Sequence, residues 1–328
     1  MRVNCYKGKQ VTGGGAPRDM EAPPAAHDAV FWATTTNGVA FRAVWDAQAH
    51  TGIREVTIRV DDEGLTMTTI TPTHNMVVHV LLEKAAFGGW GVQEKEILIP
   101  ITVGAVQRAL RGVTNKDTIT ISVLHDDPKH LLFTVYNEFT KTLVEHRVLI
   151  LVMPYERVTI PSKEVDRQVS MPSNEFAKYI KDFSPLAKAL LFRVDGETFS
   201  VSAKGDMCES KAIIKPKDNI RGEKYGNGTI TIGLGRNGNK VAMGMYNTKY
   251  LMSIIKATNL DEQVYLYMTN ESPLLIRYNV GIMGSIVFIL ANQPPAQPRT
   301  EASVASGATA PMVTSPTGSG PSVPEASL

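Results

Sequence analysis

Hydrophobic and polar positions alternate along most of the chain between residues 29 and 292. Short alternating segments with many β-branched side chains are typical of half-buried strands. The clearest predicted strands are residues 55–60, 76–82, 118–123, 131–136, 229–232, 264–268 and 286–291. The pattern therefore predicts a protein built mainly from β-sheet.

Short helices are predicted between these strands, where apolar residues recur at helical spacing instead. Residues 102–113, 174–183 and 249–258 each have one apolar stripe, and residues 39–49 have a weaker one. Ser173 is expected to cap the second of these helices. Basic residues lie away from the stripes, and they are Arg42, Arg108, Arg111, Lys178, Lys181, Lys249 and Lys256.

The two halves of the chain repeat each other in register. Residues 58–69 are echoed by residues 192–203, and residues 131–136 by residues 274–278. Between these pairs, Thr114-Asn-Lys-Asp117 recurs as Thr258-Asn-Leu-Asp261. An internal repeat indicates a duplicated domain. We therefore predict an α+β fold of two tandem domains, each made of two βαβββ units.

Composition separates this body from both ends of the chain. Residues 1–28 are rich in Gly, Pro and Ala, and the last residues are Pro, Ala, Ser, Thr and Gly with few large apolar side chains. Such segments cannot bury enough surface to order themselves. We expect a flexible leader over 1–28, a first domain over 29–150, an extended connector over 151–168, a second domain over 169–292 and a disordered tail over 293–328.

Overall composition narrows the class of protein only a little. The 328 residues are 43% hydrophobic and 20% charged, as in soluble globular proteins, and the net charge of +2 neither supports nor excludes nucleic acid. Cys5 and Cys208 suggest no disulfide framework. No apolar run reaches transmembrane length and no signal peptide is recognisable, so an intracellular protein without a membrane partner is expected.

No catalytic constellation emerges from the sequence. Residues 233–238 match G-x-G-x-x-G, but a dinucleotide site needs a helix to start there, and the residues that follow predict a strand. A glycine-rich hairpin is the better interpretation. The histidines and cysteines lack metal-ligand spacing, and Asp61-Asp62-Glu63 before Gly64 predicts a turn. We expect no enzyme activity, no cofactor and no metal.

The basic helix faces are the stronger functional signal. For a single helix, a solvated surface is the more economical explanation of two basic residues. Here the arrangement recurs in both halves, and acidic residues are mostly missing from the same faces. Such faces suit phosphate contacts without base reading. No aromatic residues are interleaved, so duplex contact is favoured over single-strand stacking.

Residues 170–183 resemble the start of the second domain of the proliferating cell nuclear antigen family, the eukaryotic-type DNA sliding clamps. Further matches are Glu63-Gly-Leu65, Ile160-Pro161, Ser272-Pro-Leu-Leu-Ile-Arg-Tyr278 and Met283-Gly284. The similarity runs in one register through about residues 29–292. A large DNA virus with its own clamp would be a fitting source.

The resemblance implies a homotrimeric, pseudo-sixfold ring around double-stranded DNA. Such a ring is a processivity factor that tethers a DNA polymerase and other replication proteins carrying a clamp-binding peptide, in the nucleus or at a viral replication site. The basic residues named above would face the channel. Alanines at Ala43 and Ala49, where the family tends to have lysine, imply a weaker first helix.

The resemblance also assigns two protein-binding surfaces. Subunit contact would use edge strands at residues 130–138 and 210–219, with Leu131, Leu132, Phe133, Val135, Ala212, Ile213 and Ile214. Partner peptides would enter a pocket lined by Ile70, His74, Val77, Val158, Ile160, Pro161, Pro273, Ile289 and Ala291. Val77 and Ile289 could equally be core residues. Asn292 replaces the proline expected after the last strand.

Other functions stay open at this point. Within the same fold, the chain could be one subunit of a hetero-trimeric checkpoint clamp, or a processivity factor that is not a trimer. From other classes, it could be a nucleotide-dependent enzyme that uses residues 233–238, or a β-rich structural interaction protein.

Overall fold

The computed structural model describes residues 28–158, 160, 164–216, 230–235, 239–270 and 272–293. Apart from Asp28 and Gln293, the expected leader and tail lie outside the described residues. No helix among the described residues is long and apolar enough to cross a bilayer.

The first half contains the predicted pair of βαβββ units. The first unit consists of β1 (Ala29–Thr35), α1 (Gly38–Ala49), β2 (Glu55–Val60), β3 (Gly64–Ile70) and β4 (Met76–Glu83). A short linking segment follows, with η1 (Lys84–Ala86) and β5 (Gly89–Val92). The second unit consists of β6 (Ile97–Thr102), α2 (Val103–Leu110), β7 (Asp117–Leu124), β8 (His130–Asn137) and β9 (Thr142–Leu149).

The second half repeats this order. Its first unit consists of β10 (Arg167–Pro172), α3 (Ser173–Phe183), β11 (Ala189–Asp195), β12 (Thr198–Lys204) and β13 (Glu209–Ile214). After β14 (Thr231–Leu234), its second unit consists of β15 (Val241–Asn247), α4 (Thr248–Ile254), η2 (Ile255–Leu260), β16 (Gln263–Met268), β17 (Leu274–Asn279) and β18 (Gly284–Leu290). The predicted duplication is therefore confirmed element by element.

Three sheets are formed, and one of them joins the two halves. The nine-stranded sheet has the order β14-β10-β16-β17-β18-β4-β3-β2-β6, so it crosses from the second half to the first where β18 pairs with β4. That antiparallel pairing runs from Gly284 opposite Leu82 to Leu290 opposite Met76. The other sheets are β5-β1-β7-β8-β9 and β13-β12-β11-β15, one in each half.

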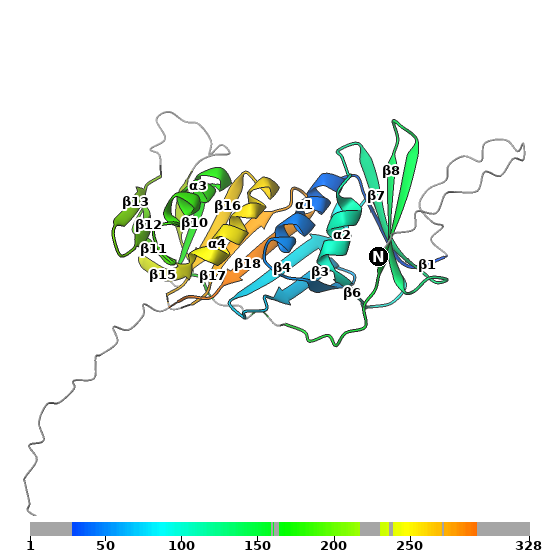
Figure 1. Ribbon diagram of the computed structural model, residues 1–328, viewed down its shortest axis with the longest axis horizontal. Coiled ribbons are helices and arrows are strands. Elements are labelled where there is room, and N and C mark those ends of the chain that lie inside the picture. Colours follow the sequence, from blue (N-terminus) through cyan, green and yellow to red (C-terminus); the bar gives the residue numbers. More distant parts are fainter. Residues whose placement is uncertain are drawn as a thin grey trace, which may run out of the picture. The chain divides into compact units, whose positions relative to one another are not determined.

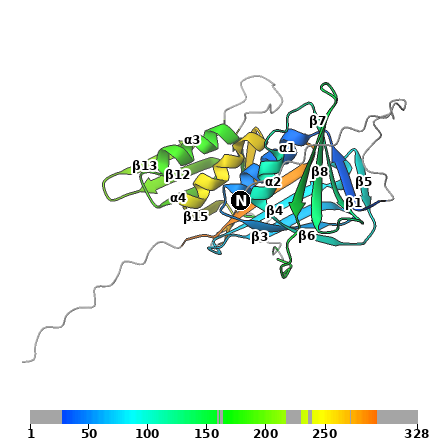
Figure 2. The same ribbon diagram turned by 45° about the vertical axis from the view of Figure 1, so that its right-hand side comes forward.

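The helices lie on one face of the nine-stranded sheet, as Figure 1 and Figure 2 show. Helix α1 buries Phe41 and Trp45 fully, with their rings edge to face at 6.1 Å between centroids. Helix α3 buries Phe176 against Phe192 in the same manner, at 6.2 Å. Burial of each such aromatic side chain stabilises the fold by about 1.5–3 kcal/mol. The apolar stripes thus hold the helices down and leave their polar faces outward.

The second unit of each half is fastened by the same carboxylate–amide pair. Asn137 in β8 donates a hydrogen bond from Nδ2 to Asp117, at 2.6 Å. Asn279 in β17 donates from Nδ2 to Asp261, at 2.8 Å. These aspartates end the repeated Thr-Asn-x-Asp sequences. The repeat therefore preserves a hydrogen bond between a helix exit and a strand as well as an apolar pattern.

Two local predictions are wrong. Ser173 is the first residue of α3 and not its cap, and its buried hydroxyl has no hydrogen-bond partner within the described chain. The glycine-rich segment is not a hairpin, because β14 pairs with β10 whereas β15 pairs with β11 in another sheet. A local sequence pattern does not show whether a hydroxyl side chain caps a helix. It also does not show which strand a given strand pairs with.

Candidate functional site

The predicted basic residues of α2, α3 and α4–η2 are all exposed. These residues are Arg108, Arg111, Lys178, Lys181, Lys249 and Lys256. Within the described part of the chain, none of them forms an ion pair. Helix α3 also exposes Glu175 and Asp182, whereas α2 contains no acid, so the two helices differ in charge. Free cations on aligned helices can contact phosphates by Coulomb attraction.

Arg42 on α1 is placed differently from the other basic residues. Its Nη1 donates hydrogen bonds to the carbonyl oxygens of Val113 at 2.8 Å and Arg111 at 3.4 Å, just beyond the end of α2. Its Nε lies 3.8 Å from Asp46 one turn along α1. Arg42 therefore ties α1 to α2, and its charge is partly satisfied within the chain.

The strand predicted to form the subunit surface of the first half is not at the edge of its sheet. Strand β8 lies inside its sheet, between β7 and β9, so β9 is the edge strand. Leu131 and Phe133 are core residues with no exposed surface, and Leu132 is 7% exposed. Val135 is half-buried. The exposed apolar residues at this edge are instead Leu143, Val144 and Leu149 of β9.

The predicted subunit surface in the second half does lie on an edge. Strand β13 pairs only with β12 among the described strands. Ile213 is 60% exposed and Ala212 is half-buried, while Ile214 is buried at 6%. Beyond β13, the predicted range continues into residues 217–219, which lie outside the described residues.

A hollow lies beside the β9 edge, between the end of α2 and the β8–β9 hairpin. Ala109, Val113, Val135, Val144 and His146 contribute to its lining. Of these residues, only Val135 was predicted from the sequence to lie at a subunit surface. The apolar side chains of the hollow come from positions that are far apart in the chain.

Three of the predicted partner-binding residues form one row across the nine-stranded sheet. Ile70 is opposite Val77, Val77 is opposite Ile289, and Ile289 is opposite Leu275. Their neighbours Met76, Val78 and Leu290 are buried in the core, so by strand alternation the row faces away from the helices. Leu275 was missed because its strand reads as ordinary core.

The loop at one end of this row is held in a defined conformation. His74 has a φ of 55°, in the left-handed region, and its side chain is exposed. Ala291 donates its backbone N–H to the carbonyl of Asn75 at 2.9 Å. The hydroxyl of Tyr250 on α4 accepts from Asn75 Nδ2 at 3.0 Å and donates to Thr73 at 2.8 Å. His74 and Ala291 therefore border the row, and exposed Pro273 precedes β17 on the same side of the row, next to Leu275.

The exit segment after β18 is fixed by Asn292. Its Oδ1 accepts the backbone N–H of Met245 at 2.9 Å, and Gln293 donates its own N–H to the Met245 carbonyl at 2.8 Å. The amide thus takes the place of a strand carbonyl along the free edge of β15. A proline would lack this side chain, which gives the departure at residue 292 a structural role.

The connector residues lie over a neighbouring part of the sheet. Val158 and Ile160 line a hollow together with Tyr155 and Arg157 from the connector and Arg59, Thr66, Thr68 and His79 from β2, β3 and β4. Thr68 and His79 are two residues away from Ile70 and Val77 along their strands, which is about 7 Å. Pro161 lies outside the described residues.

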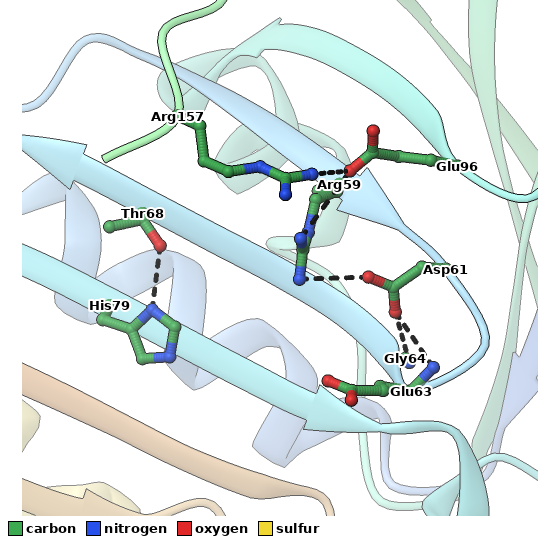
Figure 3. Close-up of polar contacts among 8 residues, drawn as sticks. All are labelled: Arg59, Asp61, Glu63, Gly64, Thr68, His79, Glu96 and Arg157. Atoms are coloured by element: carbon green, nitrogen blue, oxygen red, sulfur yellow. Dashed lines mark hydrogen bonds and ion pairs between the residues drawn. The ribbon is translucent and has the colours of Figure 1, made fainter. Parts of the chain in front are cut away.

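A chain of ion pairs fastens the connector to the first half (Figure 3). Arg157 Nη2 is 2.6 Å from Glu96 Oε1, and Arg59 Nη1 is 3.6 Å from the same oxygen. Arg59 Nη2 is 3.0 Å from Asp61, whose other oxygen accepts the N–H groups of the turn at Glu63 and Gly64. The predicted turn is thereby confirmed.

His79 lies beneath this chain and is hydrogen-bonded to Thr68. The distance between His79 Nδ1 and Thr68 Oγ1 is 2.8 Å. Burial, and then the positive charge of Arg59, lowers the pKa of His79 below its ordinary value. The ring is therefore neutral at physiological pH, and it offers one N–H and one acceptor nitrogen.

The glycine-rich segment has a packing role in its described part. Gly235 donates its N–H to the Asp166 carbonyl at 2.8 Å, and a Cβ there would lie 1.7 Å from the Val165 carbonyl oxygen. The next described element is strand β15, so the described residues show no helix for a pyrophosphate. They also contain no cluster of His, Cys, Asp and Glu that could hold a metal ion.

Tandem βαβββ units that share one long sheet, with basic helices aligned on one face of it, define the DNA-clamp fold. The chain belongs to the proliferating cell nuclear antigen family. The family's N-terminal domain matches residues 30–156 and its C-terminal domain matches residues 159–293.

Individual relatives are distant but similar over most of their length. The chain is 23% identical to a proliferating cell nuclear antigen from Chaetomium thermophilum, over 73% of this chain and 89% of the relative. It is 23% identical to a probable DNA polymerase sliding clamp of Paramecium bursaria Chlorella virus 1, over 80% of this chain and 96% of the relative. It is 24% identical to the Saccharomyces cerevisiae proliferating cell nuclear antigen, over 65% and 80%.

Proposed function

We propose that this chain is a DNA sliding clamp: a homotrimeric ring that encircles duplex DNA and tethers a polymerase and other replication proteins to it. Membership of the family and the similarity to a viral clamp support this function. The clamp acts wherever DNA is replicated, in the nucleus or at a viral replication site. The tether needs no reaction of its own, because encirclement alone retains the ring on DNA.

The main support for a ring comes from two sheet edges, one in each half, that are open to pairing with another subunit. Strand β9 ends a five-stranded sheet in the first half, and β13 ends a four-stranded sheet in the second. If β9 of one subunit pairs with β13 of the next, the two sheets join into one of nine strands, the number in the sheet that already joins the halves. The junction between subunits then copies the junction inside the subunit.

Such a head-to-tail contact closes into a ring when the rotation between subunits is right. The exposed Ile213 of β13 and the exposed Leu143, Val144 and Leu149 of β9 supply apolar surface at this contact. The hollow between α2 and the β8–β9 hairpin lies next to the same edge. We assign this hollow to the subunit contact together with the strand edge beside it. An apolar strand edge that stays open is prone to aggregation, so we expect a second subunit to cover it.

The exposed basic residues of α2, α3 and α4–η2 provide the DNA contact of the ring. Arg108, Arg111, Lys178, Lys181, Lys249 and Lys256 lie on the polar faces of helices that share one side of the sheet. Their contacts with phosphates would be sequence-independent, weak and mobile, which lets a ring slide. Arg42 has a smaller part because the chain itself engages its guanidinium.

The row Ile70–Val77–Ile289–Leu275 is the proposed docking surface for clamp-binding peptides. It has the form of a strip of apolar side chains on the side of the sheet without helices, bordered by His74, Pro273 and Ala291. A short helix with apolar and aromatic side chains would cover it. Val158 and Ile160 of the connector would form the adjacent wall.

Solution mass and DNA retention test the function together. A mass of three times the chain's 35.8 kDa is expected, whereas a persistent monomer would exclude the homotrimer and favour a different processivity factor. A ring should thread onto linear duplex from its ends and be trapped when bound protein blocks both ends. Equal retention on blocked and open DNA would exclude encirclement. A hetero-trimeric checkpoint clamp would give the trimer mass only after other subunits are added.

A further inference from the structure

The hollow beneath the connector differs in chemistry from the apolar row beside it. Arg59 and Arg157 line it together with Thr66, Thr68 and His79, and no acidic residue is found among the described residues of its lining. Tyr155, Val158 and Ile160 give it one apolar wall. An occupant that also covers the apolar row must therefore bring apolar side chains to one part of the surface and an acceptor to the other.

Both arginines contact Glu96 at the rim of the hollow, and Arg59 also contacts Asp61 at 3.0 Å. Glu96 contacts both of them, at 2.6 Å from Arg157 and 3.6 Å from Arg59. The side chains of Arg157 and Glu96 are 62% and 37% exposed, so water screens the contact between them. Exposed ion pairs of this kind are easily exchanged, because their net contribution is small.

A buried hydroxyl in the same lining has no partner. Thr66 is 8% exposed, and its Oγ1 makes no hydrogen bond within the described chain. Thr66 is directly opposite Arg59 in the sheet. Unsatisfied buried hydroxyls are uncommon in folded proteins and call for a missing acceptor or donor.

From this arrangement we propose that the hollow is a subsite for an acidic side chain of the bound partner peptide. The incoming carboxylate takes the place of Glu96 against Arg157 and Arg59, and the peptide's apolar residues cover the Ile70–Val77–Ile289–Leu275 row. The neutral His79 can donate its one N–H to the same group. This subsite selects among clamp-binding peptides, and it rests on the proposed function of the row.

Charge and shape favour a peptide carboxylate over a free anion. The arginines already hold single carboxylate oxygens, and guanidinium groups match carboxylates in geometry. The apolar wall of Tyr155, Val158 and Ile160 would be left uncovered by a small inorganic ion. A peptide that carries both kinds of side chain satisfies both surfaces.

Matched synthetic peptides test the subsite on the full-length protein. A fluorescent helical peptide with aromatic and apolar anchors is made as a series, in which a single Glu is moved along the sequence and each member has a Gln twin. We expect one Glu position to bind about fivefold tighter than its twin in fluorescence anisotropy. Arg157→Gln and Arg59→Gln should each remove most of that difference, so that the Glu and Gln twins bind alike.

The repeat supplies a matched control. Arg193 is the counterpart of Arg59 in the second half, and it pairs with Asp195 at 2.7 Å. Arg193→Gln removes the same charge from a corresponding strand without touching the hollow. The preference for Glu should survive in this variant. Its loss there would show a general charge effect and overturn the subsite.

Glu96→Gln distinguishes two roles of Glu96: replacement by a peptide carboxylate, and a purely structural ion pair that holds the connector. If the peptide carboxylate replaces Glu96, this variant binds the Glu peptide more tightly than the wild type does. If the Arg157–Glu96 pair only holds the connector, both twins bind more weakly, and the proposal is overturned. Ile289→Ser should weaken both twins alike.

The remaining outcomes distinguish the two proposals. Binding that depends on Ile289 but never distinguishes Glu from Gln would refute the subsite and leave the docking row intact. Absence of binding by every peptide of the series would refute both.

Discussion

Arg42 Nη1 donates a 2.8 Å hydrogen bond to the backbone carbonyl of Val113, and thereby fastens helix α1 to the end of helix α2. The carbonyls of Arg111 and Val113 follow the last turn of α2 and receive no helical N–H, so a side-chain donor there stabilises this end of the helix. The same guanidinium lies 3.8 Å from Asp46. Arg42 therefore stabilises the packing of α1 against α2, and its guanidinium is already partly engaged within the chain.

Replacement of Arg42 by alanine should therefore lower stability more than DNA retention. Loss of the hydrogen bonds to the end of α2 should reduce the free energy of unfolding by about 1–2 kcal/mol. Urea denaturation measures this, and the salt dependence of retention on DNA measures the other effect. Arg108→Ala is the comparison, because Arg108 is exposed and makes no ion pair within the described chain. The opposite ranking of the two variants would place Arg42 in the DNA contact.

Removal of four exposed cationic side chains should weaken DNA binding without dissociating the trimer. In Arg108→Ala, Arg111→Ala, Lys178→Ala and Lys181→Ala combined, we expect shorter retention on linear duplex. The logarithmic slope against salt should fall by roughly 0.9 for each phosphate that the variant no longer neutralises. Solution mass should not change, since none of the four residues lies on a sheet edge and only Arg108 also lines the hollow beside β9.

A charge-matched variant controls for that experiment. Lys95, Lys129, Lys204 and Lys240 are exposed and lie outside the four α-helices, so their replacement by alanine removes the same net charge. Retention should then stay close to that of the wild type. An equal decrease in retention in both variants would mean that overall charge, rather than the helix faces, attracts DNA.

Local patterns predicted much of this fold because its helices and hairpins are encoded locally. The apolar stripes located all four α-helices, and the repeat of residues 58–69 in 192–203 marked the hairpins β2–β3 and β11–β12. The order of the strands within each sheet was harder to predict from the sequence. Strand β9 has apolar pairs at its ends and Glu145, His146 and Arg147 between them, so alternation does not reveal it as the sheet edge.

The candidate site was predictable only where single residues carry it. Ile70, Val77 and Ile289 were named together through family resemblance, and the strand register brings them into one row. The ion-pair chain was missed, because Arg59, Glu96 and Arg157 are remote in sequence and each resembles an ordinary surface charge. Only the path of the connector brings them together.

A charge at the edge of β9 should break the ring and leave the subunit folded. Val144 is 42% exposed, so Val144→Asp costs the isolated subunit little, yet it would place an unpaired carboxylate in the proposed contact with β13. Sedimentation should show the mass falling to that of one chain, with an unchanged circular dichroism spectrum. Ile213→Asp should do the same from the other side. A trimer that survives both variants would exclude this edge pairing.

Phe133→Ala provides the contrast in the neighbouring strand. Its ring has no exposed surface, so its removal leaves a cavity in the core and should lower the free energy of unfolding by about 3–5 kcal/mol. Dissociation of the trimer with unaltered subunit stability would instead restore β8 to the subunit surface.

Asp117 should make the stability of the first half depend on acid pH. Burial alone would raise the pKa of its carboxyl, but hydrogen bonds from the Thr114 backbone and hydroxyl and from Asn137 outweigh burial and lower that pKa. The corresponding distances are 2.6, 2.8 and 2.6 Å. A depressed folded pKa means that the unfolded chain takes up a proton first as pH falls. The stabilisation is therefore complete above about pH 4, the unfolded value, and is lost as pH falls through the folded value.

Asp117→Asn should remove this dependence. At pH 7 the variant should lose about 1–3 kcal/mol of unfolding free energy, because an amide cannot accept all three hydrogen bonds. The difference from the wild type should shrink as urea denaturation is repeated from pH 5 down to the acid limit of folding. Asp62→Asn is the control, since Asp62 is exposed and makes no hydrogen bond within the described residues. A gap between Asp117→Asn and the wild type that stays constant with pH would show that Asp117 acts by packing and not by its charge.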